Sequence, residues 1–239
     1  MLSKREGAET DRSSVLHYFT RGGDGAGWKA VAATWVVTEP PPPGGSDEPT
    51  PTQSPKDGVV KARPKVMPAP AREAVGSVRL SPTATADLGV WGRYADYLSF
   101  TVPAGKPDSP HFERGDFTSK LVDHFNGWDE DELQRSFSYR PVGEELPVFA
   151  LENGGSLVTC TLEGIYRDRG RTAGNWIEMR AENTSGALLG GGRRKWASLE
   201  EVWSVTAVVE VLKGGGPATV LSTDAYGATK LSVKGVDWK

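Results

Sequence analysis

Few residues of this 239-residue chain have the types and spacings that metal or nucleophile chemistry needs. The single cysteine, Cys160, lies in an apolar stretch, where a buried inert thiol is commoner than a nucleophile or a ligand. The three histidines, His17, His111 and His124, are scattered and lack the spacing of a zinc site. We therefore expect no internal disulfide, no metal site and no cofactor.

A glycine run followed by three positive charges, from Gly190 to Lys195, has the composition of an anion-binding loop. It lacks the strand–loop–helix frame and the Lys-Ser/Thr ending of a phosphate loop, so a charged surface loop is the better interpretation. Of the eight tryptophans, Trp176 and Trp196 fall in this irregular, Gly- and Arg-rich part of the chain. We expect these two side chains to be exposed.

The net charge is −3 and the isoelectric point is near 5.7, which gives no electrostatic reason to expect a nucleic-acid partner. No apolar run approaches the roughly 18 residues of a transmembrane helix. The first residues carry charge but are followed by no apolar core of a secretory signal, so none is predicted. The composition indicates a soluble chain whose oligomeric state stays open.

The segment from Leu146 to Tyr166 predicts a β-hairpin. Two apolar runs flank Asn153-Gly154-Gly155, and such residues tolerate the positive φ of a tight turn. Residues of the second run alternate, so Leu157, Thr159 and Thr161 face one side and Val158, Cys160 and Leu162 face the other. Because a lone hairpin is marginal in water, other segments must cover its apolar faces.

Further strands are predicted after this hairpin. Residues 201–212 are rich in β-branched side chains, residues 218–222 form a shorter run, and residues 229–236 partly alternate. Residues 176–179 are a possible short strand. The Ser198–Glu201 sequence also matches a capping box, which makes a helix at 199–212 the alternative, but the β-branched content favours the strand.

Three helices are predicted before the hairpin. Ser81-Pro82 is a typical helix start, and the apolar residues that follow share one face, which predicts a helix over 82–99. Phe117, Leu121 and Phe125 recur at four-residue intervals and predict a helix over 117–125. Acidic residues at 129–132 would suit the first turn of a short helix over 129–137.

Composition divides the chain into four parts. Residues 1–14 are polar and predicted to be disordered. Residues 15–38 predict an isolated β-hairpin, and residues 39–71 are a Pro-, Gly-, Ser- and Thr-rich stretch predicted to be a disordered linker. Residues 72–239 predict an α+β domain in which helices at its start pack on one face of a curved antiparallel sheet.

This pattern resembles a known family. The sequence YADYL at Tyr94–Leu98, FERGDFTS at Phe112–Ser119, LPVFALENGGSLVTCTL at Leu146–Leu162 and the late strand 201–212 are similar to the NTF2-like (SnoaL-like) cone fold. More narrowly, they resemble the C-terminal domain of uncharacterised putative lipoproteins of high-GC Gram-positive bacteria. The resemblance implies a membrane-anchored, extracytoplasmic protein with an earlier cone domain, of which residues 15–38 would be the closing hairpin. No lipid-attachment cysteine is present here.

The cone resemblance implies a pocket at the wide end of the sheet, where relatives use a carboxylate with Tyr or His donors. The ligand-pocket candidates in this chain are Tyr94, Tyr97, Asp123 and His124. Tyr94 and Tyr97 share a helix side, whereas Asp96 lies roughly 200° from Tyr94. The alternative is that the tyrosines pack in the core and that Asp96, Asp123 and His124 are solvated.

No catalytic residue can be assigned from these patterns. We therefore expect a non-catalytic binding module that takes a protein or a small ligand on its sheet face or in its cone pocket. The alternative is a small-molecule enzyme of isomerase, cyclase or hydrolase type that uses the pocket. A third possibility is a structural domain that stabilises a larger assembly.

Overall fold

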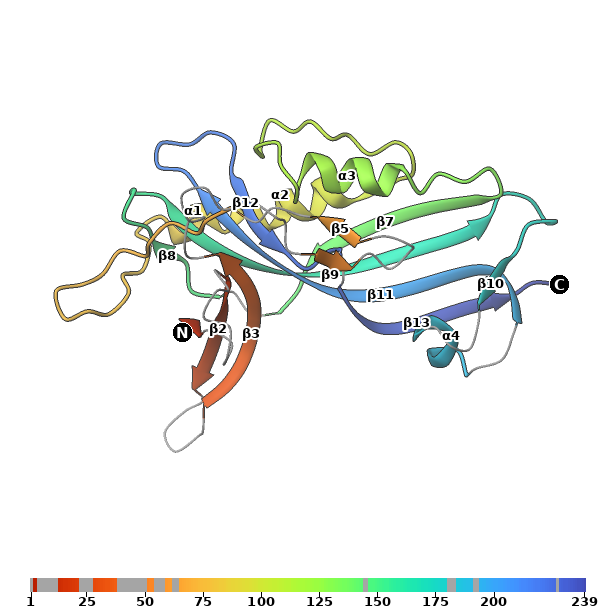
Figure 1. The fold of residues 1–239 in the computed structure, drawn as a ribbon, viewed down its shortest axis with the longest axis horizontal. Helices are drawn as coiled ribbons and strands as arrows, with labels where there is room; N and C mark the ends of the chain where they lie inside the picture. The colour runs from red at the N-terminus through yellow and green to blue at the C-terminus, as the bar shows by residue number, and fades with distance from the viewer. Residues whose placement is uncertain are drawn as a thin grey trace.

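The computed structural model describes residues 2–3, 13–21, 28–37, 51–53, 59–61, 65–143, 146–179, 184–190, 194–226 and 228–239. These residues form a mixed α+β structure that is built on a large, open antiparallel sheet with few helices (Figure 1). Within the described residues, no helix is long and apolar enough to cross a membrane.

The large sheet is organised around its two longest strands, β9 and β11, which pair from Arg169–Ser198 to Ser156–Val211. The strand order is β10-β11-β9-β7-β6; β8 also pairs with β9, and β12 and β13 pair with β11. The strands are β6 (Phe100–Thr101), β7 (Leu133–Pro141), β8 (Phe149–Ala150), β9 (Ser156–Gly170), β10 (Ile177–Met179), β11 (Arg194–Val211), β12 (Thr219–Thr223) and β13 (Thr229–Asp237).

The predicted pairing across Asn153 is confirmed, because β8 pairs with the start of β9. Gly154 has a φ of +83°, and the Asn153 side-chain oxygen accepts the Gly155 N–H at 3.0 Å. The Asn153 amide also donates to Glu210 of β11 at 2.6 Å, which ties the turn to the next strand. The strand predicted over 201–212 is confirmed too, and the helical alternative is wrong.

Alternate residues of β9 face opposite sides of the sheet, as the sequence predicts. Val158, Cys160 and Leu162 belong to the larger core, which they share with the helices; we call this side the inner face. Leu157 belongs to a second core, together with Val208 of β11; we call that side the outer face. Burial raises the pKa of the Cys160 thiol to about 12, which makes it an inert packing residue.

Two helices cover the inner face (Figure 1). The predicted helix over 82–99 is present as α1 (Ala84–Asp87) and α2 (Gly89–Leu98), which are separated at Leu88. The predicted helix over 117–125 is present as α3 (Ser119–Asn126). A further short helix, α4 (Thr184–Leu188), lies in the Gly- and Arg-rich stretch where no helix was predicted.

The helix predicted over 129–137 is wrong, because most of this segment belongs to β7. Arg135, Phe137 and Tyr139 are buried, whereas the residues between them are less buried or exposed. That alternation has the two-residue period of a strand. The acidic residues before it form the connection from α3 rather than the first turn of a helix.

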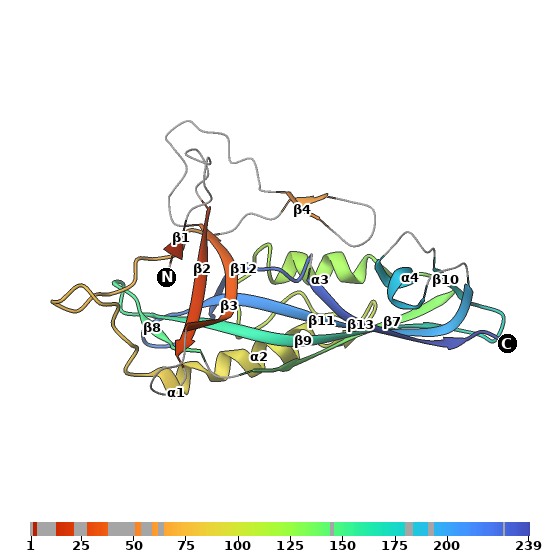
Figure 2. The same cartoon turned by 90° about the horizontal axis from the view of Figure 1, so that it is seen from below.

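The N-terminal strands pack on the outer face. Strand β2 (Ser13–Arg21) pairs with β3 (Trp28–Val37) in an antiparallel hairpin, and β1 (Leu2–Ser3) pairs with β2. Leu16, Tyr18 and Val36 lie in the second core, and the Tyr18 hydroxyl lies 2.6 Å from the Thr159 hydroxyl. The hairpin therefore covers one end of the outer face rather than standing isolated (Figure 2).

Residues 65–71, which composition assigns to the linker, lie along the sheet. Met67 and Ala71 are buried, and their N–H groups donate to Val37 and Ala150 at 2.6 and 2.8 Å. Strands β4 (Pro51–Gln53) and β5 (Val59–Lys61) pair with each other. The rest of the Pro-rich stretch and the predicted disorder before residue 13, except for β1, lie outside the described residues.

Candidate functional site

Aromatic rings fill the inner face at the end of the sheet near α3. Phe125 stacks on Phe137 with ring centroids 4.5 Å apart, and Phe137 meets Tyr166 edge-on at 4.8 Å. Tyr166 in turn stacks on Trp203 at 5.1 Å. The cavity that remains beside these rings is about 50 Å³. It has room for water but not for a drug-sized ligand, which occupies roughly 300–1,000 Å³.

Three polar side chains near this cavity bind one another, whereas the buried Trp203 Nε1 has no hydrogen-bond partner among the described residues. Glu201 accepts a hydrogen bond from Ser185 and pairs with the Lys230 ammonium at 3.0 Å, and Lys230 also contacts the Ser185 hydroxyl. Ser185 is buried, and its contacts with Glu201 and Lys230 fix α4 to the sheet.

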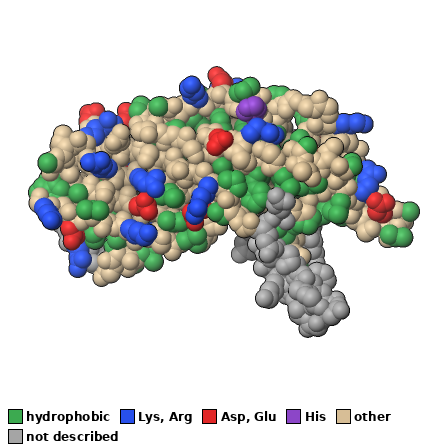
Figure 3. Space-filling view, turned by 180° about the vertical axis from the view of Figure 1, so that it is seen from behind, with side chains coloured by type: hydrophobic (Ala, Val, Ile, Leu, Met, Phe, Trp, Pro, Cys, Tyr) green, Lys and Arg blue, Asp and Glu red, His purple; other side chains and the backbone are tan. Residues whose placement is uncertain are grey.

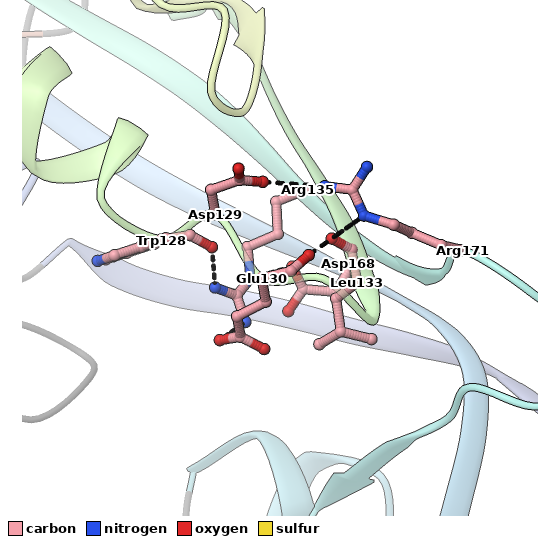
Figure 4. Close-up of polar contacts among 7 residues, drawn as sticks. All are labelled: Trp128, Asp129, Glu130, Leu133, Arg135, Asp168 and Arg171. Atoms are coloured by element: carbon pink, nitrogen blue, oxygen red, sulfur yellow. Dashed lines mark hydrogen bonds and ion pairs between the residues drawn. The ribbon is translucent and has the colours of Figure 1, made fainter.

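Two arginines fix the connection between α3 and β7 (Figure 4). Arg135 is only 4% exposed; its Nε donates to Asp168 at 3.0 Å, and its Nη atoms donate to the Trp128 carbonyl at 2.5 Å and Glu130 at 2.7 Å. Arg171 donates to Asp129 at 2.9 Å and to the backbone carbonyls of Glu130 and Leu133, each at 3.1 Å. These contacts give both arginines a structural role.

The two tyrosines predicted for a ligand pocket pack together. Tyr94 and Tyr97 stack with centroids 6.5 Å apart, and both rings contact Phe112. The Tyr94 hydroxyl donates to the Phe117 carbonyl at 2.8 Å, and the Tyr97 hydroxyl donates to the Pro107 carbonyl at 2.9 Å. Burial raises the pKa of both phenols well above the usual value. Each phenol is therefore neutral, and its hydrogen bond fixes the loop that carries the acceptor carbonyl.

The other two candidates differ in burial. Asp123 is exposed, and its charge adds to burial in raising the pKa of Tyr97. His124 is half-buried, with its ring centroid 5.4 Å from that of Trp128 and 5.6 Å from that of Tyr226, and burial lowers its pKa. None of the four candidates lines the small inner cavity. Asp96 is exposed.

Asp224 is not among the residues predicted for a site, yet it is the carboxyl group whose pKa is raised most in the described part of the chain. It follows β12, and its side chain accepts the Thr206 N–H at 2.6 Å. Burial raises its pKa to about 6, although that hydrogen bond acts in the opposite direction. Its charge also raises the pKa values of Tyr139 and Tyr166, whose hydroxyls lie 2.6 Å apart.

Asp224 gives the fold a pH dependence whose sign can be derived. An unperturbed aspartate has a pKa of 3.8, so between about pH 4 and pH 6 the folded state binds more protons than the unfolded state. This contribution therefore increases stability as the pH falls through 6. We expect the unfolding free energy of the wild type, relative to Asp224→Asn, to rise between about pH 7 and pH 4 in urea titrations. A difference that is constant with pH would contradict the assignment.

A large hollow lies on the outer face, beyond the hairpin. Arg167 and Arg169 follow Leu157 and Thr159 at even spacings along an unbroken register of β9, so they point to the outer face. The hollow is about 530 Å³, and we call it the outer-face basin. Its lining residues are Thr101, Gln134, Ser136, Arg167, Asp168, Arg169, Ser198, Leu199, Glu200, Lys234, Gly235 and Val236.

The basin has a positive floor. Arg167 pairs with Glu200 at 2.9 Å, whereas Arg169 and Lys234 are exposed and form no ion pair with any described residue. Asp168 turns to the other side, where it pairs with Arg135. Lys and Arg side chains gather on the molecular surface at this end of the sheet (Figure 3).

The sequence carries one signal for this surface. After Leu162, most outer-facing positions of β9 are polar, with Ile165 as the exception, and most outer-facing positions of β11 before Val205 are polar too, with Val202 as the exception. A sheet face whose apolar half is covered and whose polar half is open has this pattern. None of the four predicted pocket residues lines the basin. Comparisons of the chain with family models, with curated proteins and with solved structures found no match.

Proposed function

We propose that this protein is a non-catalytic binding module of NTF2-like cone type that takes its ligand in the outer-face basin. The observation that carries the proposal is the contrast between the two faces of one sheet. The cavity beside the inner-face rings is about 50 Å³, whereas the outer-face basin offers about 530 Å³. Only the second volume is in the range of ligand sites.

The cone assignment is supported by the order and packing of the elements. Helices α2 and α3 pack on one face of a sheet whose long strands β9 and β11 follow them in the chain. In this proposal, the space that a cone would leave for a ligand is occupied by Phe125, Trp128 and Tyr226. The binding surface is thereby moved to the opposite face of the sheet.

One observation favours the alternative, a small-molecule enzyme. Burial raises the pKa of Asp224 to about 6, which suits a general acid or base at neutral pH. Its charge adds to burial in raising the pKa values of Tyr139 and Tyr166. However, Asp224 does not line the inner cavity or the basin. A substrate would need space beside this carboxylate, so the binding module is the better proposal.

A thermal-shift screen on the full chain tests the proposed surface. A ligand at about one hundred times its Kd stabilises the folded state by about 2.7 kcal/mol and raises the melting temperature. We expect any stabilising ligand to lose most of this shift with the double variant Arg169→Ala/Lys234→Ala. Neither side chain forms an ion pair with a described residue, so the variant should melt close to the wild type without ligand.

The matched control removes two exposed cations from the helix side of the molecule, Arg114→Ala/Lys120→Ala. These residues pair with Asp108 and Asp116 and have side chains that are 65% and 68% exposed. The control changes the net charge by the same amount. A ligand whose shift is equal in both double variants would place binding elsewhere and overturn the proposed function.

A further inference from the structure

We infer that the ligand of the outer-face basin is an acidic polysaccharide that carries a carboxylate on its sugar units. The inference rests on the proposed function and specifies its ligand. It follows from three kinds of side chain at this end of the sheet: cations, of which Arg169 and Lys234 form no ion pair with a described residue, neutral hydroxyl and amide groups beside the arginines, and a neighbouring pair of indole rings.

The cations have the spacing of a linear polyanion. Arg167 and Arg169 are two residues apart on β9, which separates their Cα atoms by about 7 Å. Arg167 is opposite Glu200, which is opposite Lys234, so Arg167 and Lys234 lie two strands apart, about 10 Å. Arg167 already pairs with Glu200, which leaves Arg169 and Lys234 as the open cations, about 12 Å apart on the diagonal. A single small anion cannot contact both, whereas a chain with repeated carboxylates can, and guanidinium groups bind carboxylates with two parallel hydrogen bonds.

Neutral polar groups occupy the same rows of the sheet. Ser136 lies opposite Arg167, and Gln134 and Ser198 lie on either side of Arg169. These side chains donate and accept hydrogen bonds, which suits sugar hydroxyls. Clustered arginines also recognise acidic peptides, but the hydroxyl and amide groups beside these arginines have no counterpart in a chain of carboxylates alone. The chemistry of the floor thus favours the saccharide.

An aromatic pair stands next to the basin. Trp176 is 39% exposed, and its ring centroid lies 5.1 Å from that of Trp238. The Trp238 backbone N–H donates to the Lys195 carbonyl, and Trp238 is two residues beyond Val236 of the basin. The Lys195 ammonium lies 3.8 Å from the centre of the Trp176 ring. The exposed part of the Trp176 ring offers flat apolar surface at low entropic cost, which suits the apolar face of a sugar ring.

The test is titration calorimetry of the full chain with polygalacturonate, with a neutral galactan as the uncharged polymer and with poly-glutamate as the peptide polyanion. We expect polygalacturonate to bind, the neutral polymer not to bind, and affinity to fall as salt rises. Losing two exposed charge contacts at roughly 0.5–1 kcal/mol each should weaken binding by about tenfold in Arg169→Ala/Lys234→Ala. Trp176→Ala should weaken binding, and Arg114→Ala/Lys120→Ala should bind like the wild type.

The outcomes separate the ligand class from the proposed function. Equal binding of poly-glutamate with the same sensitivity to the basin variant would overturn the saccharide and leave the basin as the binding site. No binding of any of the three polymers would also overturn the proposal of a saccharide ligand. The thermal-shift screen would then test independently whether the basin is the binding site. Polygalacturonate binding that is equal in the two double variants would overturn both the ligand and the site.

Discussion

Replacing Arg135 with alanine is expected to lower the unfolding free energy by about 3–5 kcal/mol, because it removes one partner of a buried ion pair. The Arg135 side chain is 5% exposed, and its removal deletes the ion pair with Asp168, which is itself 20% exposed. The hydrogen bond from Arg135 to the Trp128 carbonyl is lost as well. Urea unfolding followed by far-ultraviolet circular dichroism measures the loss directly.

The same substitution at Arg140, on the same strand, is the matched control. Arg140 pairs with Glu163 at 2.6 Å, but its side chain is 67% exposed, so Arg140→Ala should cost less than about 1 kcal/mol. Arg135→Lys should recover only part of the stability, because one ammonium cannot reproduce donation from Nε and both Nη atoms. Equal losses of unfolding free energy in Arg135→Ala and Arg140→Ala would show that the buried contacts of Arg135 stabilise the fold no more than the exposed ion pair of Arg140.

Arg135 also shows why the sequence predicted this part of the fold wrongly. Acidic residues at 129–132 are favourable in the first turn of a helix, and that local signal predicts a helix start. The tertiary contacts decide differently: Asp129 and Glu130 face two arginines, and the strand that follows buries alternate residues. Asp168 lies 33 residues from Arg135, so no local pattern could reveal the pair.

Features with a strong local signal were predictable. The turn at Asn153 needs residues that tolerate positive φ, and β11 is long and rich in β-branched residues. The exposure of Trp176 was predicted correctly, but that of Trp196 was wrong. Trp196 packs over Gly235, where an added Cβ would lie 2.3 Å from its ring. This contact depends on a register shift between β11 and β13, which the sequence does not display.

The candidate site was less predictable than the fold. Tyr94 and Tyr97 have the chemistry of pocket residues, but two loop carbonyls accept their hydrogen bonds. The basin depends on which part of the outer face the N-terminal hairpin covers. Composition predicts that hairpin as isolated, since its residues do not indicate the strands against which it packs. Cross-sheet contacts thus determine which polar positions stay open.

A second large loss of stability is expected when Phe125, in the aromatic interior, is replaced with alanine. Phe125 is 1% exposed and packs against Phe137, Trp128 and Tyr166, at centroid distances of 4.5, 5.1 and 6.2 Å. Phe125→Ala removes these contacts and leaves a cavity, and such changes cost about 3–5 kcal/mol. Phe19→Ala is the control, because Phe19 is 41% exposed and its truncation should change stability by only about 0.5 kcal/mol.

The new cavity should also bind a small apolar ligand. Phe137 and Trp128 would line it beside the existing space of about 50 Å³, and a dry apolar cavity of sufficient size takes up benzene. Benzene should therefore raise the melting temperature of Phe125→Ala and leave that of the wild type unchanged, because the wild-type interior has no room for it. A small loss from Phe125→Ala, or stabilisation of the wild type by benzene, would mean that the inner face is open. The enzyme alternative, which needs substrate space beside Asp224, would then replace the binding module as the better proposal.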